Sequence, residues 1–199
     1  MMRKRKTIMS VILSLVIGSL ALLACGDLKG PGSDNAEESG GILYVTKITP
    51  QDRGQETYNI DVIQDTVPCE EEALTDATMT VTLSYVSAES CANQHCPNIQ
   101  ILSYRVEYTS NDAGAVLLDP LEVVTQNIYI EPDQLITLDG LLLMPVDKKM
   151  EFLNKGGDYS AEPQYQVKVT FYGVNDYGVD VKSFGETYIL VADWLTCSA

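Results

Sequence analysis

The sequence has few of the residues on which most catalytic sites depend. It contains one histidine, His95, and one tryptophan, Trp194. It has no Gly-x-Ser-x-Gly element and no phosphate-binding loop. A Ser-His-Asp triad would have to use His95, for which the sequence indicates no partner. We therefore expect no enzymatic activity.

Positive charge is also scarce. The chain has 13 lysines and arginines against 28 aspartates and glutamates, which gives a formal net charge of −15 at pH 7. Nucleic acids and anionic membrane surfaces both require a basic protein face, so neither is expected as a partner. A bound cation or a basic partner is compatible with this charge, but a solvated acidic exterior is the simpler interpretation. We expect no cofactor.

The N-terminus has the two segments of a signal peptide in their usual order. Basic residues occupy positions 3–6, and an apolar run follows from Ile8 to Ala24, interrupted only by serine and glycine. A basic segment followed by an apolar one is typical of export signals. The run is slightly short for a membrane span, which needs about 20 apolar residues. Removing residues 1–24 takes away four positive charges and changes the formal charge from −15 to −19.

The apolar run ends in the sequence Leu-Leu-Ala-Cys-Gly at positions 22–26. This ending resembles the lipobox of bacterial lipoproteins. The resemblance implies cleavage before Cys25, diacylation of its thiol and acylation of the new amine, and two or three acyl chains anchor a protein stably. Gly26, where aspartate would cause retention, favours the outer membrane under the enterobacterial sorting rule. An ordinary signal peptide, or an uncleaved anchor with Cys25 incidental, is the alternative.

Residues 26–41 read GDLKGPGSDNAEESGG and contain almost no apolar side chain. Such a segment cannot bury enough surface to order itself, so it is expected to be a flexible tether. The chain therefore divides into a signal peptide at 1–24, an acylated cysteine with its tether at 25–41, and one domain of ordinary size at 42–199.

The rest of the chain alternates between apolar and polar residues in short windows separated by turn residues. Between positions 78 and 86, for example, Met79, Val81, Leu83 and Tyr85 fall on one face. This period of two is typical of half-buried antiparallel strands. Strands are predicted at 42–48, 58–63, 78–86, 99–109, 125–131, 134–144, 165–172 and 177–192. One helix is predicted at 146–154, with Val146, Met150 and Leu153 at helical spacing.

This number of strands predicts an all-β, antiparallel sandwich of the immunoglobulin or fibronectin type III kind with one short crossover helix. Tyr165 begins the penultimate strand, where such sandwiches often place a corner tyrosine whose hydroxyl bonds back to the upstream chain. The alternative is that Tyr165 is simply a core residue. Gly185 predicts a bend in the last strand, and Gly173 to Gly178 are expected to form the turn before it.

Three stretches also resemble a known group. DVIQD…TDATMTVTLSYV, LSYRVEY and YQVKVTFYGVNDYGVDV are similar to uncharacterised proteobacterial lipoproteins with a single immunoglobulin-like domain. The likeness covers most of residues 58–197. It implies the fold and the lipid anchor, and it implies no activity.

Four cysteines follow the lipobox: Cys69, Cys91, Cys96 and Cys197. An even number in an exported protein indicates disulfides, and three pairings are possible. In an immunoglobulin-like sandwich the first strand or its second half runs parallel to the last, so we expect Cys69–Cys197 at one pole and Cys91–Cys96 at the other. The first bridge would stabilise the fold by about 4–5 kcal/mol.

Two metal sites are possible alternatives. Cys91, His95 and Cys96, with Cys69 as a fourth ligand, would suit zinc, although the usual spacing of zinc ligands is missing. The acidic residues at 70–72 and the turn at Asn175-Asp176 offer oxygens that calcium prefers, but no Asp-x-Asp-x-Asp ladder is present.

These observations favour a lipid-anchored, non-enzymatic protein of the bacterial envelope, whose immunoglobulin-like domain binds another envelope protein or supports envelope structure. The alternative is an accessory or scaffold subunit of a secreted redox or transport complex.

Overall fold

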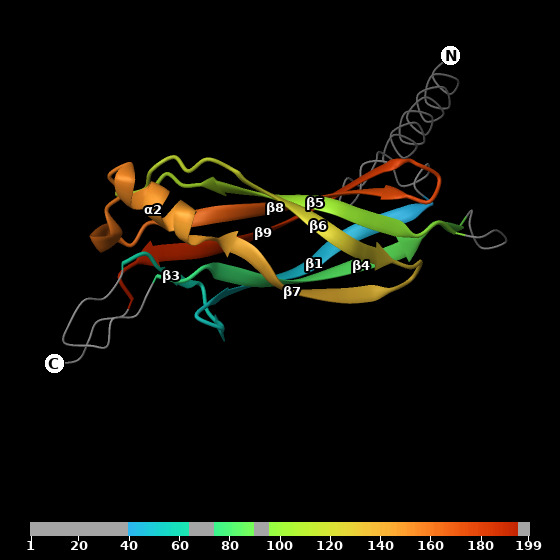
Figure 1. Cartoon of the computed structure of the whole chain (residues 1–199), viewed down its shortest axis with the longest axis horizontal. Coiled ribbons are helices and arrows are strands. Elements are labelled where there is room, and N and C mark those ends of the chain that lie inside the picture. Colours follow the sequence, from blue (N-terminus) through green and yellow to red (C-terminus); the bar gives the residue numbers. More distant parts are fainter. Residues whose placement is uncertain (1–39, 64–73, 90–95, 195–199) are drawn as a thin grey trace, which may run out of the picture. The chain divides into compact units, whose positions relative to one another are not determined.

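The computed structural model describes residues 40–63, 74–89 and 96–194, all of which belong to the compact unit Pro31–Ala199. The elements of this unit are shown in Figure 1. In chain order they are β1 (Gly41–Asp52), β2 (Gln55–Glu56), β3 (Asn59–Asp61), β4 (Ala77–Ser87), β5 (Ile99–Thr109), β6 (Leu121–Ile130), β7 (Leu135–Met144), α2 (Val146–Asn154), the 3-10 turn η2 (Tyr159–Ala161), β8 (Gln164–Asn175) and β9 (Asp180–Ala192).

The strands form two sheets, and the predicted all-β sandwich with one short helix is confirmed. One sheet has the order β2-β1-β4-β7, and the other has the order β3-β9-β8-β5-β6. The neighbouring strands β1, β4 and β7 of the first sheet have the same order as strands A, B and E of an immunoglobulin sandwich. In the second sheet, β9, β8 and β5 have the order of its strands G, F and C. Helix α2 carries the chain from β7 of the first sheet to β8 of the second.

The N-terminal strands β1 and β3 lie in different sheets. β1 pairs antiparallel with β4, whereas β3 pairs parallel with β9, with Asn59 opposite Leu190 and Asp61 opposite Ala192. β3 and β9 therefore end at the same pole of the sandwich. This parallel pairing is the arrangement expected from the sequence.

The core lies between the sheets and follows the predicted alternation. Met79, Val81, Leu83 and Tyr85 of β4 are fully buried. From the opposite sheet, β8 contributes its alternate residues, which are also buried: Tyr165, Val167, Val169 and Phe171. Because these two inner faces are apolar, they pack together and hold the sheets in place.

Several strand boundaries differ from the expectation. β6 begins at Leu121 rather than 125, and β8 continues through Gly173 as far as Asn175. Gly173 is therefore not part of the turn. A Cβ atom at Gly173 would lie 2.5 Å from the carbonyl oxygen of Gln100, so this glycine permits a close approach between β8 and β5.

Gly185 also marks a close approach. β9 pairs with β8 without a register shift on either side of Gly185, and the strand is not interrupted there. A Cβ atom at Gly185 would lie 2.5 Å from Cγ1 of Val45. The absence of a side chain at Gly185 thus lets β9 of the second sheet pack closely against β1 of the first.

Helix α2 has the predicted bounds, but it buries different residues. Its fully buried side chains are Lys149 and Phe152, while Met150 is 43% exposed. The Phe152 ring meets the Tyr165 ring edge-on, with centroids 6.4 Å apart. A helical pattern of apolar residues alone could not reveal a buried lysine, because the lysine depends on a partner from a distant strand.

Candidate binding pocket and its buried ion pairs

A pocket of about 460 Å³, here called the end pocket, opens where β1 turns into β2. Its volume is within the range of small-molecule sites, about 300–1,000 Å³. Its lining comes from β1, β2, β3 and the chain after β9: Asp52, Arg53, Gln55, Thr57, Asn59, Asp61 and Trp194.

A two-residue hairpin loop shapes one wall of the end pocket. Asp52 pairs with Gln55, and the loop residues Arg53 and Gly54 have φ angles of 50° and 74°. Positive φ at both central positions is typical of the tight turns that match strand twist. Glycine adopts a positive φ readily, whereas other residues rarely do, so the contacts around Arg53 must hold its backbone in this conformation.

Asp52 connects three elements behind the pocket. Its Oδ1 lies 3.3 Å from Nζ of Lys149 in α2, and both side chains are nearly inaccessible, at 6% and 1% exposure. Its Oδ2 accepts a hydrogen bond of 2.8 Å from the backbone N–H of Asp61 in β3. Burial lowers the pKa of Lys149, and the charge of Asp52 opposes that effect. The pair therefore orders the pocket wall.

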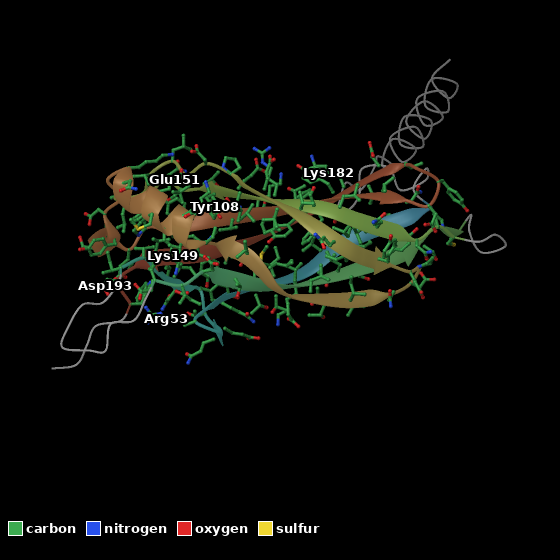
Figure 2. All side chains as sticks on the ribbon, in the orientation of Figure 1. Arg53, Tyr108, Lys149, Glu151, Lys182 and Asp193 are labelled. Carbon is green, nitrogen blue, oxygen red and sulfur yellow. The ribbon has the colours of Figure 1, made fainter. Side chains whose placement is uncertain are left out.

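A second ion pair lies beside the first. Nη2 of Arg53 contacts Oδ2 of Asp61 at 2.8 Å, and the backbone N–H of Ile63 donates to Oδ1 of Asp61. Burial raises the pKa of Asp61, and the nearby carboxylate of Asp193 adds to the rise, although Arg53 opposes it. Figure 2 shows Arg53, Lys149 and Asp193 gathered at one end of the sandwich.

Trp194 completes the pocket from the C-terminal side. Its indole Nε1–H donates to the carbonyl oxygen of Leu190 at 3.4 Å, which holds the ring near the end of β9. Tryptophan and arginine are among the residues that most often dominate binding energy at interfaces. The end pocket places one of each, Trp194 and Arg53, around a partly polar hollow. Such an arrangement suits recognition better than covalent chemistry.

Among the described residues, no group of three or more histidine, cysteine, aspartate or glutamate side chains is placed to hold a metal ion. In the turn between β8 and β9, Oδ1 of Asn175 accepts hydrogen bonds from the backbone of Tyr177 and Val179. Asp176 likewise accepts one from the backbone N–H of Asn98. These oxygens, considered above for calcium, fix the turn. The acidic residues at 70–72 lie outside the described residues.

Most of the residues singled out from the sequence also lie outside the described residues. These are Cys25, Cys69, Cys91, His95 and Cys197. Cys96 is described, and it is half-buried just before β5. The lipid anchor and both disulfides therefore stay predictions. Within the described part of the chain, no helix is both long and apolar enough to cross a membrane.

Sequence reasoning identified Trp194 only as the single tryptophan, and it missed Asp52, Arg53, Asp61 and Lys149. The one available signal was an Asp-Arg-Gly turn after an apolar strand. That signal predicts a hairpin, but it does not indicate that the flanking aspartate pairs with a lysine 97 residues away.

Comparison with known proteins adds little. No family model matches the chain, and no curated protein matches it. Among solved structures, one described as an ApaA protein from Bordetella pertussis aligns with a TM-score of 0.40 and 13% identity, covering 79% of this chain and 98% of the other. A likeness this weak supports no conclusion about fold or function.

Proposed function

We propose that this protein is a lipid-anchored, non-enzymatic component of the bacterial envelope, and that it binds another envelope protein through the end pocket. The observation that carries the proposal is that Trp194 and Arg53 line one preformed hollow whose wall is held by the buried Lys149–Asp52 pair and the partly buried Arg53–Asp61 pair. The predicted signal peptide and the resemblance of residues 22–26 to a lipobox support the location.

Preorganisation is the physical advantage of this arrangement. Ordering a side chain on binding costs about 0.5–1.5 kcal/mol, and a wall that is already ordered avoids that cost. The sequence predicts a flexible tether before β1, which begins at Gly41, and a coil of about 14 residues would span roughly 19–22 Å, enough for the domain to reach neighbours near the membrane. An inserted side chain from a partner would contact the indole of Trp194 and the polar groups of β2 and β3.

The experiment purifies the full-length protein from its own envelope after crosslinking in intact cells, and compares it with Trp194→Ala. Loss of a wild-type crosslinked partner from Trp194→Ala would support the proposal. Tyr177→Ala is the matched control, because Tyr177 is 64% exposed in the turn between β8 and β9. A partner that crosslinks equally to all three proteins would contradict the use of the end pocket.

The same preparation tests the anchor. Intact mass spectrometry is expected to show a chain starting at Cys25 with two or three acyl chains and four fewer hydrogens for two disulfides. A mass that still contains Met1 would overturn the lipoprotein assignment. A stable stoichiometric complex that includes a redox or transport protein would instead favour the accessory-subunit alternative.

A further inference from the structure

A second pocket, here called the β5–β8 pocket, opens where β5 ends and β8 begins. Its volume is about 270 Å³. Its lining side chains bear only hydroxyl, amide or carboxylate groups: Thr109, Ser110, Asn111, Asp112, Gln164 and Gln166. None of these residues is a lysine, arginine or histidine.

Hydrogen bonds hold the pocket in shape. Oδ2 of Asp112 accepts from the backbone N–H of Gln164 at 2.9 Å, which ties the loop after β5 to the start of β8. The hydroxyl of Ser110 accepts from the backbone N–H of Asp112. The side-chain amides of Asn111 and Gln164 make no hydrogen bond with the described residues, so both can bind a ligand.

A tyrosine lies beside this pocket on the same outer face of the sheet. In register across three strands, Thr109 of β5 is opposite Gln166 of β8, which is opposite Tyr188 of β9. Tyr188 is 43% exposed, and its ring stacks on Tyr58 with centroids 4.6 Å apart and planes 9° apart. The stacked pair holds the Tyr188 ring in one orientation next to the polar pocket.

We propose that the β5–β8 pocket and Tyr188 bind a neutral pyranose ring of a polysaccharide. A sugar presents hydroxyls that both donate and accept, and carboxamides such as those of Asn111 and Gln164 also do both. The C–H face of a pyranose is apolar and packs on an aromatic ring. The pocket is slightly smaller than sites for drug-sized ligands, about 300–1,000 Å³, and so suits a single ring.

Charge argues against the other common polar ligands. Phosphates and carboxylates are usually bound by arginine, lysine or backbone N–H groups at a helix N-terminus. The residues that line the β5–β8 pocket include no arginine or lysine and do not begin a helix. Their one carboxylate, Asp112, already accepts a hydrogen bond from the backbone N–H of Gln164. A hydroxyl-rich neutral ligand matches these uncharged groups. The site is separate from the end pocket, and only the choice of envelope glycans as probes depends on the proposed function.

The test measures retention of the full-length protein on immobilised polysaccharides in a detergent without a sugar headgroup, since a maltoside would compete. The probes are peptidoglycan sacculi, polysaccharide released from lipopolysaccharide, and secreted exopolysaccharide. The three arms distinguish the possible sources of the same sugar chemistry. Each variant is first checked for an unchanged thermal unfolding midpoint.

We expect wild-type protein to be retained on at least one probe. Tyr188→Ala should weaken binding about ten-fold, because it removes the stacking surface, whereas Tyr188→Phe should retain it. Gln164→Ala and Asn111→Ala should each weaken binding about five-fold through a lost hydrogen bond. Tyr177→Ala should bind as wild type does.

Two outcomes would overturn the proposal: no retention on any of the three probes, or retention that is unchanged in Tyr188→Ala and Gln164→Ala. Trp194→Ala distinguishes the two sites. If it loses a protein partner and keeps glycan binding, both proposals stand. If glycan binding is present and no protein partner is found, only the end-pocket proposal fails.

Discussion

Nζ of Lys149 lies 3.3 Å from Oδ1 of Asp52, although the two residues are 97 positions apart and both are buried. The contact joins the crossover helix α2 to the end of β1. Removing two charges from water costs several kcal/mol per ion, so such a pair is maintained only where the geometry compensates. Here the backbone N–H of Asp61 also donates to Asp52, which satisfies its second oxygen.

Breaking this pair on one side should be strongly destabilising. Lys149→Met leaves Asp52 buried without its cation, and we expect the free energy of unfolding to fall by about 3–5 kcal/mol. Urea unfolding of the full-length protein measures the change. The double variant Lys149→Met/Asp52→Asn, which leaves neither charge behind, should lose less than the sum of the two single variants. Additive losses would mean that the two side chains do not interact.

Glu151 should make stability depend on acid pH. Burial alone would raise its pKa, but hydrogen bonds from Lys148, Lys155 and the backbone N–H of Asp119 outweigh burial and lower the pKa to about 2 from 4.5. Because the folded-state pKa is the lower one, the stabilisation is complete above pH 4.5 and is lost as pH falls toward 2. It amounts to at most about 3 kcal/mol.

Glu151→Gln is expected to flatten this part of the stability–pH curve, measured by urea unfolding at several pH values between 2 and 7. Glu122→Gln is the control, because its side chain is 74% exposed and contacts Arg105 only at 3.5 Å. An equal acid dependence in wild type and Glu151→Gln would show that Glu151 is not the group responsible.

The hydroxyl of Tyr165 bonds twice to the backbone of Val116. It donates to the carbonyl oxygen and accepts from the N–H, each at 2.8 Å. Tyr165→Phe leaves both groups of Val116 without this partner, so stability should fall by about 1–3 kcal/mol. Hydrogen exchange at the Val116 amide should accelerate. Tyr172→Phe, on the outer face of β8, should change neither quantity.

Gly185→Ala should destabilise the fold by about 1–3 kcal/mol through overpacking. The added methyl group would lie 2.5 Å from Cγ1 of Val45. Thermal unfolding of Gly185→Ala, Val45→Ala and the double variant checks the cause. If contact with Val45 is the reason, the double variant should be more stable than the sum of the single effects predicts. Strictly additive effects would indicate another cause.

The sequence predicted the strands well where each one buries a single face. Met79, Val81, Leu83 and Tyr85 show why: alternate burial leaves a period of two that can be read without knowing the partner strand. Tyr165 is a core residue, and its hydroxyl bonds to the upstream chain, but not to the residues just before β8 as the expected corner tyrosine would. Its partner Val116 is 49 residues upstream, between β5 and β6, and no local pattern indicated that contact.

The predictions failed at residues whose role depends on a distant neighbour. Gly173 was expected in a turn, because glycine is common in turns. Instead it lies within β8, where the backbone of β5 approaches too closely to leave room for a Cβ atom. Lys149 was not singled out at all, because burial of a lysine is unfavourable unless a carboxylate from elsewhere accompanies it, and the sequence did not indicate that Asp52 would do so.

The sequence alone determined the class of the fold, the number and faces of most strands, the bounds of the helix, and the expectation of export and lipidation, because each depends on local pattern or on a short motif. Tertiary structure decided the rest. It brought Asp52, Asp61 and Trp194 to one pocket and Asn111 and Gln164 to another, with Tyr188 beside the second pocket. Both sites are built from strand ends far apart in the chain, and only sheet register places such residues side by side.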